Sequence, residues 1–316
     1  MNKILAVAGP TASGKSDLAV ELAKCYDGEV VSCDSMQIYK GMNIGTAKAT
    51  AEEMQGIPHH LIDFLDAGDE YSVSDYVADA TKTVSDIQSR GKVPVFCGGT
   101  GLYLTSFLSG LEFTEFENNQ EVHDKVHKFL DENGKEALYK RLCEIDPVSA
   151  QSIDMNNVKR VLRAVEVFET TGICASEWNR RSREKASPKD CLVIGLDFSD
   201  RELLYDRIDK RVDIMLERGL VQEAKSLYDS GALNSKTASQ AIAYKEFIPY
   251  FKDETSLEEC VEILKRNSRR YAKRQLTWFR RNPDIKWIYR DGKNFDEVLD
   301  EARKFAEEYL KEGACE

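Results

Sequence analysis

A glycine-rich stretch near the start of the chain, Gly9-Pro10-Thr11-Ala12-Ser13-Gly14-Lys15-Ser16, constrains the fold more than any other feature. It matches the pattern G-x-x-x-x-G-K-[ST] of a phosphate-binding P-loop. Residues 3–8 predict a short apolar strand before it, and residues 17–24 predict a helix after it. In this arrangement backbone N–H groups surround a di- or triphosphate at the positive end of the helix. Lys15 would neutralise phosphate charge, and the Ser16 hydroxyl would bind Mg²⁺.

The region from residue 1 to about 111 alternates predicted strands with a predicted helix. Residues 29–35 and 92–100 predict strands, and residues 74–90 between them predict a helix. This pattern indicates an α/β fold with a P-loop NTPase-like parallel sheet flanked by helices, and ligands at the carboxyl ends of its strands. Three of those ends have residues capable of chemistry: the P-loop, Asp34-Ser35 and Gly98-Gly99-Thr100.

The rest of the chain predicts an insertion and a helical C-terminal part. Residues 112–189 are charged and helical in pattern, so we expect a helical insertion domain, with the core formed by residues 1–111 and 190–316. Residues 191–197 predict a buried strand that continues the sheet. The helices expected after it span residues 203–217, 257–281 and 295–311.

Composition excludes several classes of protein. The 316 residues are 42% hydrophobic and 31% charged, which is a globular composition. No apolar run approaches membrane-spanning length, and residues 4–8 are too short for a signal peptide. The eight cysteines form no C-x-x-C pair, so we expect thiols in a reducing cytosol and a cytoplasmic protein. We also expect a monomer. The net charge of −11 would oppose a nucleic-acid partner if it were evenly spread.

The charge is not evenly spread. Residues 265–281 contain eight basic and no acidic residues, with Tyr271, Trp278 and Phe279 between them. A solvated helix face is the ordinary explanation of a charged run. A run of one sign in an acidic chain instead favours a polyanionic partner, with cations on phosphates and aromatic rings under bases. Smaller basic clusters agree: Lys159, Arg160 and Arg163; then Arg180, Arg181, Arg183 and Lys185.

Asp34 and the histidines are the other candidates for chemistry. Asp34, at a predicted strand end beside the P-loop, could bind Mg²⁺ or act as a general base, although Asp before Ser is commonly a cap. We expect a structural role for the loop residues His59 and His60. His123 and His127 lie four apart, but H-E-x-x-H is absent, so we do not expect zinc. The strand before Gly98 lacks the terminal Asp of P-loop hydrolases, which favours a diphosphate that departs whole.

An ordered set of motifs resembles the tRNA dimethylallyltransferases, also called tRNA isopentenyltransferases, over essentially the full length. The matching stretches are residues 9–16, 34–42, 44–48, 58–63, 98–103 and 273–280. Ala243 departs from the usual glycine, Ala49 and Cys174 stand where proline is common, and His123 stands where some members have arginine. The sequence has no C-terminal zinc finger of the eukaryotic type, so we expect a bacterial-type member.

The resemblance implies transfer of a dimethylallyl group from dimethylallyl diphosphate to N6 of the adenosine 3′ of the anticodon, position 37, in tRNA. It implies Mg²⁺, with Ser16 as its ligand, and diphosphate binding by Gly9, Pro10, Thr11, Ala12, Ser13, Gly14, Lys15 and Ser16. The implied catalytic residues are Asp34 as base, Thr11, Thr100, and Arg211, with Arg207 as the alternative arginine. The implied contacts to the tRNA anticodon stem-loop are Asp34, Ser35, Met36, Gln37, Thr100, His123, Lys159, Arg160, Arg163, Gln240, Tyr244, Lys245, Lys273, Arg274, Gln275, Trp278 and Arg280.

Two other functions stay open at this point. A small-molecule kinase would use the same P-loop for ATP, and it would have no need of the basic run. An ATP-gated RNA-binding protein without chemistry would keep its binding when Asp34 is lost. The basic run counts against the kinase, and Asp34 beside the P-loop counts against the pure binder.

Overall fold

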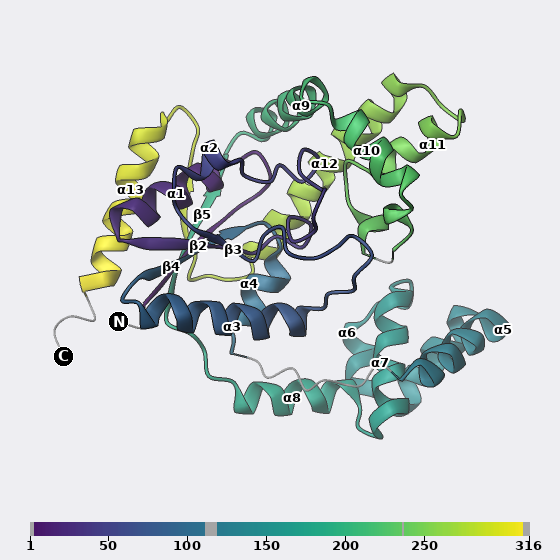
Figure 1. Ribbon diagram of the computed structural model, residues 1–316. Coiled ribbons are helices and arrows are strands. Elements are labelled where there is room, and N and C mark those ends of the chain that lie inside the picture. The colour runs from purple at the N-terminus through teal and green to yellow at the C-terminus, as the bar shows by residue number, and fades with distance from the viewer. Residues whose placement is uncertain (1–2, 111–118, 236, 312–316) are drawn as a thin grey trace. The chain divides into compact units, whose positions relative to one another are not determined.

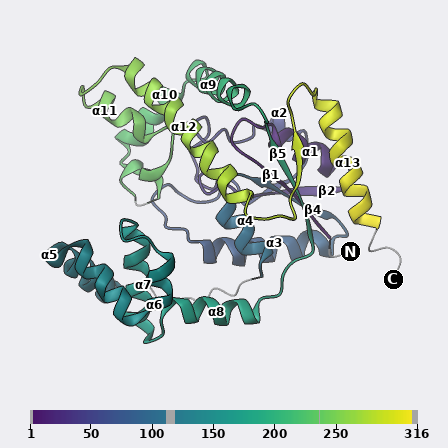
Figure 2. The ribbon, with the colours of Figure 1, turned by 180° about the vertical axis from the view of Figure 1, so that it is seen from behind.

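The computed structural model describes residues 3–110, 119–235 and 237–311, apart from the side chains of residues 183, 185, 234 and 238. The chain divides into two compact units, of which the first comprises residues 1–108 and 189–316 and the second residues 109–188. The boundary expected between residues 111 and 112 lies outside the described residues. Figures 1 and 2 show the ribbon from opposite sides.

The first unit is built on a six-stranded sheet in which every neighbouring pair is parallel. The predicted α/β fold is therefore confirmed. The strand order is β3-β2-β4-β1-β5-β6. The strands are β1 (Ile4–Ala8), β2 (Gly28–Ser32), β3 (His59–His60), β4 (Val93–Gly98), β5 (Cys191–Asp197) and β6 (Lys286–Tyr289).

Helices cover both faces of this sheet, as the alternation of side chains along β1 requires. Leu5 and Val7 point to the face covered by α1 (Lys15–Cys25) and α13 (Phe295–Lys311). Ile4 and Ala6 point to the face covered by α3 (Val73–Ser89), α4 (Gly101–Leu108) and part of α12 (Leu257–Phe279). Ser72 begins α3 with a capping box, in which its side chain and that of Asp75 satisfy each other's backbone N–H groups. Within the described residues we find no helix with the length and apolar character needed to cross a membrane.

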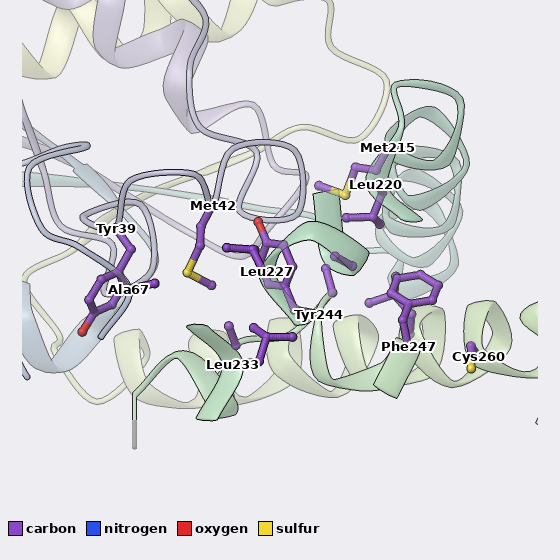
Figure 3. Packing of buried hydrophobic residues seen from close by; sticks show 14 of the residues in the cluster. Tyr39, Met42, Ala67, Met215, Leu220, Leu227, Leu233, Tyr244, Phe247 and Cys260 are labelled. Atoms are coloured by element: carbon purple, nitrogen blue, oxygen red, sulfur yellow. The ribbon is translucent and has the colours of Figure 1, made fainter. Parts of the chain in front are cut away.

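A separate apolar cluster packs helices α9 (Arg201–Glu217) and α10 (Leu220–Asp229) and one side of α12 against residues 38–47 (Figure 3). Tyr39, Tyr244 and Phe247 are buried in it. This packing fixes the loop after β2 relative to α9. The short elements of the first unit are α2 (Ala51–Met54), η1 (Ala232–Asn234), η2 (Ala238–Gln240), η3 (Lys245–Phe247) and α11 (Ile248–Phe251).

The second unit is helical in its described part, as its sequence predicts. It contains α5 (Gln120–Ile145), α6 (Pro147–Ser152), α7 (Val158–Thr171) and α8 (Ala175–Lys185). Gly134 has non-helical angles, with φ 80° and ψ 172°, and divides α5 into two segments. Buried Asp146 caps α6 through the Ser149 N–H at 3.0 Å and accepts from the Ser176 N–H at 2.8 Å. Burial alone would raise the pKa of Asp146, but the hydrogen bonds from Ser149 and Ser176 lower it.

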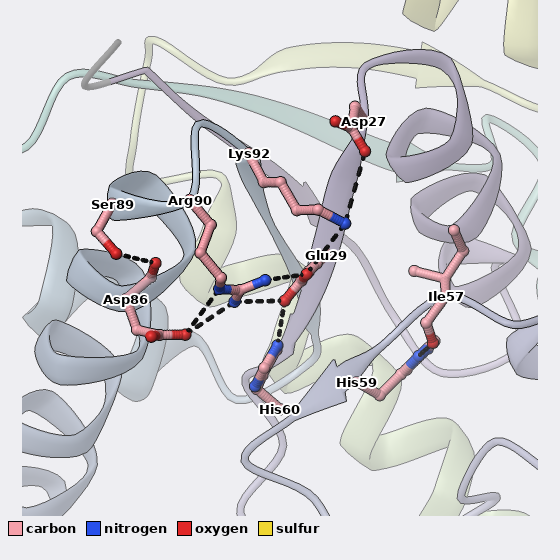
Figure 4. A network of polar contacts seen from close by, with 9 residues as sticks. All are labelled: Asp27, Glu29, Ile57, His59, His60, Asp86, Ser89, Arg90 and Lys92. Carbon is pink, nitrogen blue, oxygen red and sulfur yellow. Dashed lines mark hydrogen bonds and ion pairs between the residues drawn. The ribbon is translucent and has the colours of Figure 1, made fainter.

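The expectation of a loop at His59 and His60 is wrong, because these residues form the edge strand β3 beside β2. Their side chains have structural contacts (Figure 4). His60 Nε2 lies 2.7 Å from the carboxylate of buried Glu29, and His59 Nδ1 lies 2.9 Å from the Ile57 carbonyl oxygen. Arg90 and Lys92 also pair with Glu29, and the hydrogen bond from Arg90 is the main reason that the pKa of Glu29 falls to about 2.

Candidate functional site

Two cavities meet at the P-loop of the first unit. One, of about 360 Å³, lies at the carboxyl ends of β1, β2 and β4, where a parallel sheet binds its ligands. The other, of about 810 Å³, lies between the start of α1, α2 and α9. Both are lined by Lys15, Ser16, Ala47, Arg211 and Met215. The shared lining makes the P-loop end of α1 accessible from two directions.

The P-loop has the strand–loop–helix form that its sequence predicts. It leaves β1 at Ala8 and enters α1 at Lys15. Gly14 has φ of 83°, in the left-handed region that favours glycine, and a Cβ added there would lie 2.1 Å from Arg290 Nη1. Glycine at position 14 is thus required both by the turn and by the approach of an arginine from the end of β6.

Two arginines hold the backbone of the P-loop through its carbonyl groups. Arg207 Nε donates to the Ala12 carbonyl oxygen at 2.9 Å, and Arg290 Nη1 donates to the Ser13 carbonyl oxygen at 2.6 Å. Because these donors bind the carbonyl side of the loop, they do not compete with an anion for its N–H groups, although those of Thr11 and Ser13 already donate to Gln275 and Pro10.

Lys15 and Arg211 place two partly buried positive charges beside this loop. Burial lowers the pKa of Lys15, and the nearby Arg211 charge lowers it further. Burial also lowers the pKa of Arg211, whereas Asp34 raises it. Lys15 Nζ contacts the Pro10 carbonyl oxygen at 3.3 Å, and the guanidinium of Arg211 has no hydrogen-bond or ion-pair partner within the described ranges. Two partly buried cations of this kind favour an anionic ligand between them.

Asp34 follows β2 and lines the smaller cavity. Its Oδ1 accepts from the backbone N–H of Met36 at 2.9 Å and of Gln37 at 3.3 Å. Its Oδ2 has no hydrogen-bond partner in the described part of the chain. One carboxylate oxygen thus forms the cap-like turn expected of Asp before Ser, and the other is left for a ligand.

Hydrogen bonds connect the loops that end β1, β2 and β4. Thr100 Oγ1 accepts from the Ser35 N–H at 3.0 Å. Gln275 of α12 accepts from the Thr11 N–H through Oε1 at 2.9 Å and donates from Nε2 to the Gly99 carbonyl oxygen at 3.0 Å. The loop of the predicted catalytic residue Thr11 is therefore joined to α12. The loop of Thr100 is joined to α12 through Gly99 and to the turn after Asp34 through Ser35.

Glu223 of α10 holds the loop of residues 43–47, which contributes to the lining of both cavities. The Glu223 carboxylate accepts from the N–H groups of Asn43, Ile44 and Gly45 at 3.2, 3.0 and 3.1 Å, and from the Tyr244 hydroxyl at 2.8 Å. Gln37, Gln240, Lys245 and Arg274 line the smaller cavity near this loop.

One departure from the family pattern has a structural correlate here. Ala243, where the resemblance leads us to expect glycine, has φ of 81°. This left-handed conformation costs a residue with a Cβ about 1–2 kcal/mol. The Ala243 N–H donates to Glu246 at 2.9 Å, which helps to hold the turn despite that strain.

The basic run of α12 is only partly free of acidic partners. Lys265 pairs with Asp213 at 2.7 Å, Arg269 with Asp209 at 2.6 Å, and Arg280 with buried Asp197 at 2.7 Å. Four other basic residues are exposed, lie on one face of the helix at positions i, i+4, i+7 and i+8, and have no acidic partner within the described residues. We call them the basic stripe: Arg266, Arg270, Lys273 and Arg274.

Several predicted RNA contacts have their side chains engaged inside the protein. Tyr244 is fully buried, Gln275 bridges two loops, and Trp278 Nε1 donates to Thr105 Oγ1 at 2.9 Å. Their role in RNA binding stays a prediction. The predicted contacts that line the smaller cavity are Asp34, Ser35, Met36, Gln37, Gln240, Lys245, Arg274 and Gln275. Those of the second unit lie on α5 and α7: His123, Lys159, Arg160 and Arg163.

Sequence reasoning missed Arg290, Glu223 and Asp197 as residues of the site or its support, and it named Tyr271 only as an aromatic residue of the basic run. Arg290 follows β6, and the alternation Lys286-Trp287-Ile288-Tyr289 could have revealed that strand. Tyr271 lines the smaller cavity, and burial together with the Asp34 charge raises its pKa. Asp197 does end a strand beside β1, but Arg201 at 2.8 Å and Arg280 occupy its carboxylate.

The parallel sheet, the P-loop and the strand-end carboxylate together define a P-loop-type α/β protein. The family model described as IPP transferase matches residues 37–282 of the chain. The tRNA dimethylallyltransferase of Acetivibrio thermocellus is 48% identical over 299 residues, which are 95% of each chain. That of Thermoanaerobacter sp. (strain X514) is 46% identical over 298 residues, which are 94% of this chain and 95% of the relative.

Solved structures agree with these relatives. The full-length tRNA isopentenylpyrophosphate transferase from Bacillus halodurans superimposes with a TM-score of 0.74 at 43% identity, covering 99% of this chain and 98% of that one. A eukaryotic dimethylallyltransferase described as acting on tRNA gives a TM-score of 0.83 at 32% identity, covering 98% of this chain and 80% of that one. The chain belongs to the tRNA dimethylallyltransferase family, and this membership does not favour the kinase alternative.

Proposed function

We propose that this chain transfers the dimethylallyl group of dimethylallyl diphosphate to N6 of adenosine 37 in tRNA and releases diphosphate. The observation that carries the proposal is that one cavity brings a strand-end carboxylate, Asp34, next to the phosphate-binding residues Lys15 and Ser16. Such a site serves a reaction in which a phosphorylated group departs while a proton is accepted nearby.

The diphosphate binds to the P-loop N–H groups, Lys15 and Arg211. Cleavage of the allylic C–O bond leaves a cation-like dimethylallyl fragment and adds negative charge to the diphosphate. Lys15 and Arg211 stabilise that charge, and their burial strengthens the interaction because little water screens it. Arg211 is the better candidate than Arg207 for this contact, because the guanidinium of Arg207 already donates to Ala12.

Mg²⁺ fits the donor set at the P-loop. Ser16 lines both cavities at the start of α1 and offers the oxygen ligand that Mg²⁺ prefers. When bound, the ion would neutralise charge on the departing diphosphate.

Asp34 accepts the proton of the acceptor amine. The N6 amine forms a bond to C1 of the dimethylallyl group, its proton goes to Asp34 Oδ2, and the electron pair of the C–O bond leaves with the diphosphate. Oδ2 is suited to this step because Oδ1 is already held by Met36 and Gln37. A base in a single-stranded loop reaches such a cavity at low energetic cost.

The basic stripe on α12 binds the phosphates of the RNA. Arg274 lies both on the stripe and in the lining of the smaller cavity, so the stripe leads to the acceptor site. Exposed Lys159 and Arg160 of α7 are further contacts in this proposal.

The experiment is incubation of the protein with Mg²⁺, dimethylallyl diphosphate and an anticodon stem-loop, followed by mass measurement of the RNA. We expect a gain of one dimethylallyl unit, and no gain when the target adenosine is replaced by guanosine. An unmodified stem-loop and an unmodified full-length tRNA, together with ATP-dependent phosphorylation of a small hydroxyl compound, would overturn the proposal in favour of a kinase.

A further inference from the structure

Two of the four histidines of the chain lie together in the second unit, far along the sequence from the P-loop. His123 and His127 are one helical turn apart on the first segment of α5, with ring centroids 4.2 Å apart. Glu166 of α7 faces both of them. Its Oε1 lies 2.9 Å from His123 Nδ1 and 3.9 Å from His127 Nε2.

We propose that His123, His127 and Glu166 form a binding site for a borderline divalent metal of the Zn²⁺ class. One ligand atom from each residue lies within 4.8 Å of the others. Ligand atoms about 2.0–2.2 Å from a tetrahedral Zn²⁺ lie roughly 3.3 Å apart, and the two separations from Glu166 are on either side of that value. With the third separation, between the two imidazole nitrogens, within 4.8 Å, side-chain movements of no more than about 1.5 Å bring all three onto one ion.

The donor types select the metal. Two imidazole nitrogens and one carboxylate oxygen suit Zn²⁺, Co²⁺ or Ni²⁺, whereas Mg²⁺ and Ca²⁺ prefer oxygen ligands only. Three protein ligands leave a fourth position for water or another group. This site is thus distinct in chemistry from the Mg²⁺ site proposed at Ser16.

The surroundings support the carboxylate as a ligand. Glu166 is largely buried, with 15% of its side chain exposed, whereas the two histidines are 39% and 44% exposed. Arg163 Nη1 lies 3.9 Å from the other oxygen, Oε2, and so favours the orientation that turns Oε1 toward the histidines. A partly buried ligand on one helix and two accessible ligands on another would join α5 to α7 through the ion.

Sequence spacing alone does not indicate this site. The third ligand lies on a different helix, 39 positions after His127, and no motif relates the two. The alternative explanation is a hydrogen bond between His123 and Glu166 without any metal. That explanation gives His127 no role. Replacement of His127 should therefore weaken metal binding if the metal site exists.

The test uses the full-length, tag-free protein with its thiols blocked, so that cysteines do not bind the probe. Equilibrium dialysis against ZnCl₂ should show one Zn²⁺ bound to the parent. His127→Ala and Glu166→Gln should each bind Zn²⁺ at least about tenfold more weakly, since even an outer partner of a metal site contributes about 10–100-fold. Lys128→Ala, an exposed change on the same helix segment, should bind like the parent. Zn²⁺ should also raise the Tm of the parent and not that of the two ligand variants.

Circular dichroism of each variant without metal establishes that it is folded, and Glu166→Gln provides a second variant if His127→Ala is not. Equal Zn²⁺ binding by the parent and either folded ligand variant would overturn the proposal, as would no Zn²⁺ binding by the parent. A Co²⁺ absorption spectrum that stays that of the free hexaaqua ion in the presence of the protein would overturn it as well.

Discussion

Gln275 Oε1 accepts a hydrogen bond from the Thr11 N–H at 2.9 Å, which joins the basic helix α12 directly to the P-loop. The same amide donates to Gly99 after β4. One side chain therefore sets the distance between the phosphate-binding loop, the loop after β4 and the helix that displays the basic stripe.

Replacement of Gln275 by leucine should weaken the binding of dimethylallyl diphosphate without weakening RNA binding. The Thr11 N–H and the Gly99 carbonyl would both lose a partner, which costs about 1–3 kcal/mol for each buried group. We expect the KM for dimethylallyl diphosphate to rise about tenfold and RNA affinity to change less than twofold. Steady-state kinetics and RNA titrations measure the two quantities, with Thr277→Ala on the exposed side of α12 as the control. A tenfold loss of RNA affinity instead would make Gln275 a direct RNA contact.

Asp34→Asn should abolish most of the turnover and leave both substrates bound. Asparagine retains an oxygen that accepts from Met36 and Gln37, so the turn is preserved while the proton acceptor is lost. General-base catalysis contributes about 10²–10⁴-fold, so kcat should fall at least 100-fold. Single-turnover assays with saturating RNA measure this step. Undiminished turnover would remove Asp34 as the base.

Arg211→Gln and Arg207→Gln should differ in what they damage. Arg211 has no partner among the described residues, so its loss should lower kcat about 10²-fold, by the loss of charge stabilisation, and leave stability unchanged or higher. Arg207 holds the Ala12 carbonyl, so its loss should lower the free energy of unfolding by about 1–3 kcal/mol. Chemical denaturation and kinetics of both variants provide the comparison. The opposite pattern would assign the diphosphate contact to Arg207.

The basic stripe should set the salt dependence of RNA binding. Each phosphate contact contributes about 0.7–0.9 to the slope of log K against log salt concentration. Arg270→Gln and Lys273→Gln should each reduce the slope by about that amount. Lys265→Gln is the matched control, because Lys265 pairs with Asp213 and should leave the slope nearly unchanged. Equal slopes for all variants would place the RNA on another surface.

Glu29 should contribute stability that is lost in acid. Its pKa is about 2 in the folded protein against 4.5 ordinarily, because Arg90, His60 and Lys92 donate to the charged form. A lowered pKa stabilises the fold above about pH 4.5 and loses that effect as pH falls toward 2, an effect on the order of 3 kcal/mol. The difference in unfolding free energy between the parent and Glu29→Gln should therefore shrink from pH 6 to pH 3. A difference that is constant with pH would contradict this assignment.

The sequence predicts the sheet core well because the P-loop, the strand-end residues and the apolar strands are local patterns. It predicts β5 and α13 with the bounds that the structure gives. It does not predict β3, since His59 and His60 form a strand only by pairing with β2. Nor does it predict the pairing of Lys265 and Arg269 with acids of α9, because those contacts join segments about 50–60 residues apart.

The site shows the same division between local and distant contacts. Lys15, Ser16 and Asp34 are predicted by their motifs, and all three line one cavity. Arg290 and Glu223 act through contacts with residues 277 and about 180 positions earlier in the chain, and no spacing rule connects such partners. The kink at Gly134 in α5 likewise has no clear signal beyond the glycine itself.

The strand order has a consequence for synthesis of the chain. The central strand β1 pairs with β4 on one side and with β5 on the other, and residues 109–188 must be made before β5 exists. At ~5–20 residues per second, that interval lasts roughly 4–16 s. During it β1 has one open edge, which is the kind of surface that recruits other chains. A nascent chain paused in this interval should therefore be more prone to aggregate than one released after β5 has paired.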